Sequence, residues 1–396
     1  MIVRGPAAPL AHLRTGPLAR VRSVASRPGA TRRWTVVGLA VVILCSLPAL
    51  VGALPVSTPE RSLEELLADV RSSASVPFTG YAEARGTLNL PDVSSVTGPT
   101  VNLLSDRSRL RIWHAGANRF RVDRLTLGAE TSRYVSGDIT LSWDSDTRRI
   151  SREVANPQLP LPEPPDVLPT SLGRRLVEAL PADGAGVRLG GTDRIAGRAT
   201  REVRWTPNDR RSLVGDVRLW VDPTNGLPLR VELRPVGSEL VAFETGLIDL
   251  TLAPPDPEVL RFDVNGTQRA DVSDALPPSG PDLIPPFRLP PALVGLRQRS
   301  DAAPFVATYG DGVALVAVAG LDSATADSIR QQIDSGGRST LRGTFGEGTL
   351  IEAPMLRALI FSSADRGYVL AGTVTVEVLQ AMALELATNP PERTFP

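Results

Sequence analysis

The uncharged stretch at residues 34–54 constrains the fold of this chain more than any other feature. As a helix, with a rise of about 1.5 Å per residue, it reaches across a hydrocarbon layer of about 30 Å. Seven arginines precede it, and the first acidic residue of the chain is Glu60. An excess of arginine keeps that end of a first apolar helix in the cytoplasm. The sequence therefore predicts a basic cytoplasmic tail at 1–33, a transmembrane helix at 34–54, and a single-pass cell-membrane protein whose bulk is extracytoplasmic.

A cleaved signal peptide is the alternative interpretation of this stretch. Val51, Gly52 and Ala53 form a small-residue run of the kind that signal peptidase accepts, but the apolar run exceeds the usual 7–15 residues. The sequence favours an uncleaved anchor and leaves cleavage near Ala53 open. Cys45, the only cysteine, lies inside the apolar stretch, so the exported part has no intrachain disulfide and must rely on packing.

Charge limits the partners of the exported part. Without the seven leading arginines the chain holds 36 basic and 43 acidic residues, a net charge of −7. A nucleic-acid surface needs a basic patch, so an acidic exported part argues against nucleic acid as a partner.

Alternating residues predict an antiparallel sheet after the apolar stretch. The segments 109–114 and 119–124 alternate apolar and charged side chains and flank a short turn, as a hairpin with one buried face does. A second hairpin at 216–233 carries Asn225-Gly226, which supplies the positive φ of a tight turn. Helices are predicted at 60–72 and 171–180, and a proline-dense run at 156–169 predicts an extended surface connection. The fold class is therefore α+β.

The apolar face of this sheet is the candidate binding site. An ordinary core filled by the two helices is the alternative for the same residues. We expect one shared face from the alternation of ten side chains: Leu110, Ile112, Phe120, Val122, Ile139, Leu141, Leu219, Val221, Leu229 and Val231.

A resemblance becomes specific between residues 193 and 233. The chain carries an Ala196-Gly197-Arg198 strand, a Pro207-Asn208-Asp209-Arg210 turn and a Leu219-Trp220…Gly226-Leu227-Pro228-Leu229-Arg230 hairpin, in that order. This set resembles the exported sigma-factor regulators of the MucB/RseB type.

The resemblance implies a two-domain plan. The expected N-terminal domain, residues 57–270, is a LolA-like unclosed antiparallel β-barrel with covering helices. A proline-rich linker at 271–292 leads to a small α+β C-terminal domain at 293–390. The membrane anchor is a departure, because the better-known family members are soluble after signal cleavage.

No constellation for catalysis or metal binding emerges from the sequence. Of the two histidines, His12 lies in the tail and His114 at a strand end, on opposite sides of the predicted membrane. There is no Cys/His pair, metal-ligand spacing or nucleophile motif. We expect no enzyme activity, no cofactor and no metal.

Two functions remain. By the resemblance, the chain is a membrane-tethered regulatory sensor that binds the exported part of a membrane-spanning anti-sigma factor, with a lipid or acyl chain as a possible signal. The alternative is a LolA-like lipid or lipoprotein carrier, for which a second domain is not needed.

Overall fold

The computed structural model describes residues 28–53, 58–87, 102–153, 163–262, 272–274, 288–299, 306–333 and 338–391. Most of the basic tail and most of the proline-rich linker lie outside these residues. By its contacts the chain separates into two units, residues 1–55 and residues 56–396. The first unit contains helix α1 (Pro28–Ala53). No helix in the described part of the chain is both long enough and apolar enough to cross a membrane.

The second unit begins with helix α2 (Leu63–Ser72). Ser62 and Glu65 cap it reciprocally, since the Ser62 hydroxyl accepts from the Glu65 backbone N–H and the Glu65 carboxylate accepts from that of Ser62. A 3-10 turn, η1 (Ser73–Ser75), follows. The helix predicted at 60–72 is thus confirmed, with its start moved to Leu63.

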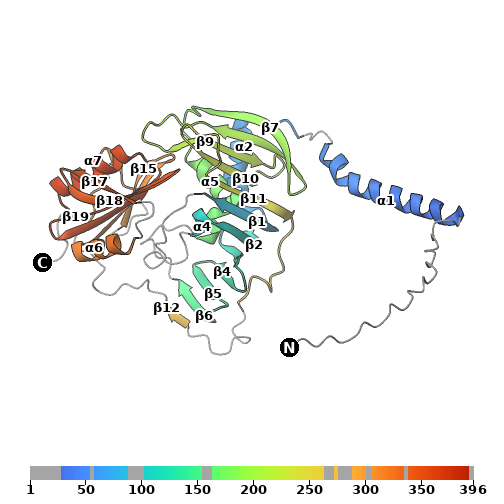
Figure 1. Cartoon of the computed structure of the whole chain (residues 1–396), viewed down its shortest axis with the longest axis horizontal. Coiled ribbons are helices and arrows are strands. Elements are labelled where there is room, and N and C mark those ends of the chain that lie inside the picture. The colour runs from blue at the N-terminus through green and yellow to red at the C-terminus, as the bar shows by residue number, and fades with distance from the viewer. Residues whose placement is uncertain are drawn as a thin grey trace, which may run out of the picture. The chain divides into compact units, whose positions relative to one another are not determined.

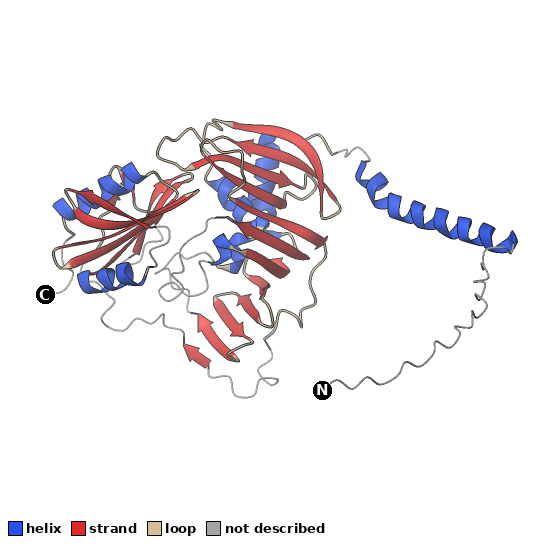
Figure 2. Ribbon diagram, in the orientation of Figure 1, coloured by secondary structure: helices blue, strands red, loops and turns tan. Residues whose placement is uncertain are grey.

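The largest sheet among the described residues has twelve strands, in the order β12-β6-β5-β4-β3-β2-β1-β11-β10-β9-β8-β7. Figures 1 and 2 show the ribbon of this sheet. All neighbours are antiparallel except β12 and β6, and the two ends of the sheet do not pair with each other. The expected unclosed antiparallel sheet is confirmed. Its strands are β1 (Phe78–Gly86), β2 (Arg107–Gly116), β3 (Arg119–Leu125), β4 (Glu130–Ser136), β5 (Ile139–Asp144), β6 (Arg149–Glu153), β7 (Val187–Ile195), β8 (Arg198–Trp205), β9 (Val214–Val221), β10 (Pro228–Pro235), β11 (Phe243–Thr251) and β12 (Val272–Asp274).

Helices α2, α4 and α5 lie on one face of this sheet. A short helix, α4 (Asn102–Ser105), contacts β1, and α5 (Pro169–Glu178) packs on β10 and α2. Gly173 permits this approach, because a Cβ there would lie 2.5 Å from Pro228 Cβ and 3.4 Å from Leu219 Cδ2. We call this side the helix face and the opposite side the open face. The helix face carries the larger core, with Leu66 and Val70 of α2 fully buried in it.

The proline-dense run differs from its prediction. Residues 154–162 lie outside the described residues, but residues 164–167 form the 3-10 turn η3 (Pro164–Val167), which leads directly into α5. Pro169 occupies the first turn of α5, where its missing N–H costs nothing, and no side chain caps that end. The connection is therefore partly helical and not simply extended, and α5 begins before Thr170.

The C-terminal part is a six-stranded antiparallel sheet between two helices, in the order β15-β16-β20-β19-β18-β17. Helix α6 packs on β16, β19 and β20, and helix α7 packs on the other face. The elements are β13 (Ala292–Leu293), β14 (Leu296–Arg297), β15 (Val306–Asp311), β16 (Ala314–Asp322), α6 (Ser323–Gln332), β17 (Arg338–Gly343), β18 (Gly346–Ala353), β19 (Leu356–Ser363), β20 (Arg366–Gly372) and α7 (Val376–Thr388). These strands and helices agree with the α+β class expected for the C-terminal part.

Candidate functional site

Strand pairing shows which of the ten predicted side chains share a face. Val122 lies opposite Ile112, and Val231 lies opposite Leu219. The register across β1, β2, β10 and β11 carries the same face through the middle of the sheet. Eight of the ten side chains therefore lie on the helix face: Leu110, Ile112, Phe120, Val122, Leu219, Val221, Leu229 and Val231.

Ile139 and Leu141 lie on the open face, which corrects the expectation of one shared face. The two-residue turn between β4 and β5 pairs Ser136 with Ile139, and Tyr134 with Leu141. Tyr134 in turn lies opposite Arg121, on the other side of the sheet from Val122. Leu141 is apolar because the open face is partly covered there: Phe262 contacts both Tyr134 and Trp143, with ring centroids 5.3 and 6.0 Å away.

The eight side chains on the helix face are packed as a core. Seven of them are no more than 1 % exposed, and they form one cluster with residues of α2 and α5. Phe120 is only partly buried at the edge of this cluster. In the described residues, the middle of the helix face is thus filled by protein, and Phe120 is the least buried of the eight side chains.

A histidine lies beside Phe120, and an arginine lies near that histidine. The His114 ring stacks with Phe78 and Phe120 at 5.0 and 6.1 Å, and its Nδ1 lies 3.0 Å from the Val76 carbonyl oxygen. Burial, together with the nearby Arg174 guanidinium, lowers the pKa of His114. Burial also lowers the pKa of Arg174, whose Nη1 has no hydrogen-bond partner within the described part of the chain. A buried guanidinium with a spare donor suits an anionic group.

The open face carries a second buried charge. Asp123 is fully buried and accepts two hydrogen bonds from Arg121, at 2.7 and 2.8 Å. The Arg121 guanidinium lies 4.9 Å from the Trp113 ring and 4.7 Å from the Tyr134 ring. Arg121 Nη1 also donates to the Val259 carbonyl, which fastens the segment after β11 over this face.

Residues of the expected Pro207–Arg210 turn lead into a joint between the two sheets. The Leu213 N–H donates to the Thr373 carbonyl at 2.8 Å, and the Thr375 N–H donates to the Arg211 carbonyl at 2.9 Å. The Arg211 side chain pairs with Asp209 at 2.8 Å and with Asp311 at 3.3 Å. Hydrogen bonds from Arg211 hold the pKa of Asp209 below its usual value.

Apolar packing extends this joint. Val313 and Met355, in turns between strands of the C-terminal sheet, are nearly fully buried in the same cluster as the helix face. At the neighbouring Gly312, a Cβ would lie 3.8 Å from the Trp205 ring. By contacts, residues 56–396 accordingly form one compact unit. The boundaries predicted at 271–292 stay a prediction.

The hairpin and strand motifs also meet in space. Arg198 Nε donates to Asp222 at 2.7 Å, and Arg198 Nη2 donates to the Thr224 hydroxyl at 2.9 Å. Asp222 is 1 % exposed and also accepts from the Thr224 backbone N–H. The loop from Asp222 to Leu227 is wider than the tight Asn-Gly turn expected, and Gly226, with φ of 72°, is the residue that takes the left-handed conformation.

Comparison with known families covers this region. Residues 171–242 match the model of the MucB/RseB N-terminal domain. The MucB/RseB segment, as we call these residues, contains α5 from its third residue onward, the joint residues 209–213 and the β9–β10 hairpin. The resemblance drawn from the motifs is confirmed. A comparison with curated protein sequences finds no match.

Several solved structures are similar to the chain. The MucA/MucB complex of Pseudomonas aeruginosa matches with 17% identity and a TM-score of 0.45, covering 81% of this chain and 96% of that one. A crystal structure of MucB matches with 18% identity and a TM-score of 0.42, covering 83% and 98%. A LolA superfamily protein from Nitrosomonas europaea matches with 12% identity and a TM-score of 0.24, covering 52% and 99%.

Sequence reasoning missed Arg174 and Arg211. Arg174 is one of two adjacent arginines in α5, and helical spacing alone does not say which of them turns toward the sheet. Arg211 directly follows the Pro207–Arg210 turn. The sequence identifies this turn as a motif, but it does not show that Arg211 contacts the C-terminal sheet. Among the described residues, no group of three or more His, Cys, Asp or Glu is placed to hold a metal ion.

Proposed function

We propose that this chain is an extracytoplasmic regulatory protein that binds the exported part of a membrane-spanning anti-sigma factor. The observation that carries the proposal is the match of residues 171–242 to the MucB/RseB N-terminal domain. The matched segment supplies both the helix that closes the core and the joint to the C-terminal sheet. A regulator that binds its partner with both sheets needs a joint that holds the two sheets together. A lipid or lipoprotein carrier does not need one.

Membrane attachment through residues 34–54 is part of this proposal. Its support is the uncharged sequence itself and the seven arginines before it. Tethering raises the effective concentration of a binding module beside a membrane-embedded partner. N-terminal sequencing of the mature protein tests the tether, because cleavage near Ala53 would release the exported part.

The test of partner binding is cross-linking in the native host. A tagged full-length chain is cross-linked in intact cells, purified from solubilised membranes, and its partners are identified by mass spectrometry. We expect one single-span membrane protein whose cytoplasmic part retains a sigma factor. Deleting the gene of this chain should then change transcription by that sigma factor.

Two matched variants test whether binding requires the joint. Met355→Glu places a charge in the buried joint, whereas Leu384→Glu places one on the exposed side of α7. If no single-span protein is recovered at low or high salt, the proposal is wrong. If both variants retain the partner equally, binding does not require the joint.

A lipid signal is a second candidate, favoured by the unpartnered Nη1 of Arg174 near His114, whose ring stacks with Phe120. A lipid with an acidic headgroup would place that group against Arg174 and its chain along Phe120. Native mass spectrometry of the full chain should show acyl adducts that are lost in Phe120→Glu and reduced in Arg174→Gln. Leu141→Glu is the matched control, since Leu141 lies on the open face. Adducts that persist in all three variants would exclude this site.

A further inference from the structure

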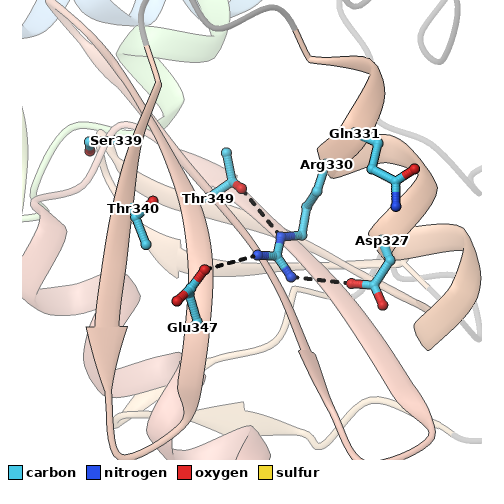
Figure 3. A pocket seen from close by; sticks show the side chains of 7 residues that line it. All are labelled: Asp327, Arg330, Gln331, Ser339, Thr340, Glu347 and Thr349. Atoms are coloured by element: carbon cyan, nitrogen blue, oxygen red, sulfur yellow. Dashed lines mark hydrogen bonds and ion pairs between the residues drawn. The ribbon is translucent and has the colours of Figure 1, made fainter.

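A polar recess lies in the C-terminal part, between α6 and the β17–β18 hairpin (Figure 3). It has a volume of about 700 Å³, within the range of small-molecule sites. Helix α6 packs on β16, β19 and β20, and the sheet extends beyond them to β18 and β17. The recess lies where the helix leaves these last two strands uncovered. Its lining is Asp327, Arg330, Gln331, Ser339, Thr340, Glu347 and Thr349.

Arg330 is held in the middle of this recess, as Figure 3 shows. Its Nη1 lies 3.2 Å from Asp327 Oδ1, its Nη2 lies 3.8 Å from Glu347 Oε1, and its Nε donates to the Thr349 hydroxyl at 3.3 Å. The carboxylates are themselves anchored. Asp327 accepts from the Ser362 hydroxyl at 2.9 Å, and Glu347 accepts from Arg342 at 3.0 Å. The polar groups are therefore positioned before any ligand arrives.

The lining defines the chemistry of a ligand. None of the seven side chains is apolar or aromatic, so the recess offers an acyl chain nothing to pack against. An anion would meet two carboxylates, and a cation would meet the Arg330 guanidinium. Asp327 and Glu347 are about half exposed, so both can still accept hydrogen bonds. The lining of the recess thus alternates hydrogen-bond donors with acceptors, and neither positive nor negative charge dominates it.

We propose that this recess binds a neutral, hydroxyl-rich glycan segment. A sugar hydroxyl is both a donor and an acceptor, so neighbouring hydroxyls can donate to Asp327 or Glu347 and accept from Arg330 or Gln331. Ser339 and Thr340 are exposed on β17 and add hydroxyls at the rim. This site lies apart from the helix face and the joint, and it does not depend on the proposed partner.

The test uses the full chain in detergent micelles and the neutral oligosaccharide chitotetraose as probe. Saturation-transfer NMR should show contact, with an affinity in the millimolar range. Ser339→Ala and Thr340→Val each remove one hydroxyl and should weaken binding by about 3- to 10-fold, the effect of one hydrogen bond. Thr388→Val, at the exposed end of α7, is the matched control and should leave binding unchanged.

Charge provides a second, independent readout. A carboxylated oligosaccharide of equal length should bind more weakly than chitotetraose, and Glu347→Gln should narrow that difference because it removes one repelling carboxylate. Absence of saturation transfer overturns the proposal. So does binding that is unchanged in both hydroxyl variants, or equal binding of tetra-alanine, which would indicate a peptide site instead.

Discussion

Gly226 gives the sharpest test of how the MucB/RseB segment is packed. Its φ of 72° costs an L-residue about 1–2 kcal/mol. A Cβ there would also lie 2.2 Å from the Asp69 carbonyl oxygen and 2.3 Å from its carbon, both in the backbone of α2. Relief requires α2 to move by about 1 Å against a close-packed core, an overpacking cost of roughly 1–3 kcal/mol. Gly226→Ala should therefore lower the free energy of unfolding by about 2–5 kcal/mol.

Gly197 is the matched control for this prediction. Its φ is 76°, but a Cβ there would have no atom within 4 Å. Gly197→Ala should cost only the backbone term of about 1–2 kcal/mol. Urea unfolding of the full-length variants, followed by tryptophan fluorescence, compares the two. If Gly226→Ala is no more destabilising than Gly197→Ala, the close approach of α2 to the hairpin is wrong.

Three further predictions concern other parts of the second unit. Burial lowers the pKa of His114 in the folded state, so the stability that its neutral ring contributes is complete above about pH 6.5 and is lost as the pH falls below that value. His114→Gln should therefore make the free energy of unfolding less dependent on pH below about 6.5, and an unchanged pH profile would contradict this prediction. Arg121→Met should lower the free energy of unfolding by about 3–5 kcal/mol, because it leaves the fully buried Asp123 carboxylate without its partner. In chemical unfolding the double variant Arg121→Met/Asp123→Leu should recover most of this loss, and a double variant less stable than the single one would refute the prediction. Met355→Glu should split calorimetric unfolding into two transitions, whereas Leu384→Glu should keep one, as the shared core requires.

Period-two alternation predicted the hairpins at 109–124 and 216–233 well because their strands have one face in a core. It did not predict faces across turns. Ile139 and Leu141 alternate as cleanly as Ile112, but the pairing of Ser136 with Ile139 puts them on the open face. That parity depends on the turn, and one residue more or less reverses it. The cover that makes the open face apolar there includes Phe262, far away in the sequence.

Strand β17 lacks the period-two alternation in its sequence, RSTLRG, for a different physical reason. It is the last strand of its sheet, so one of its edges has no described neighbour, and its residues are mostly exposed. An exposed edge strand has no need of the apolar alternation that marks a buried one. The recess beside β17 could not be predicted from the sequence either, because Arg330 and Glu347 are distant in sequence and come together only near the end of α6.

The residues that carry the family resemblance are structural in this chain. Arg198 of the strand motif binds Asp222 of the hairpin motif, and Asp209 of the turn motif holds Arg211 at the joint. Gly226 allows the hairpin to touch α2. Because these contacts fix the sheet and the joint, their presence argues for the shared architecture and says little about which partner is bound. If the proposed functions hold, specificity depends on groups outside these motifs, such as Arg174 and the polar lining of the Arg330 recess.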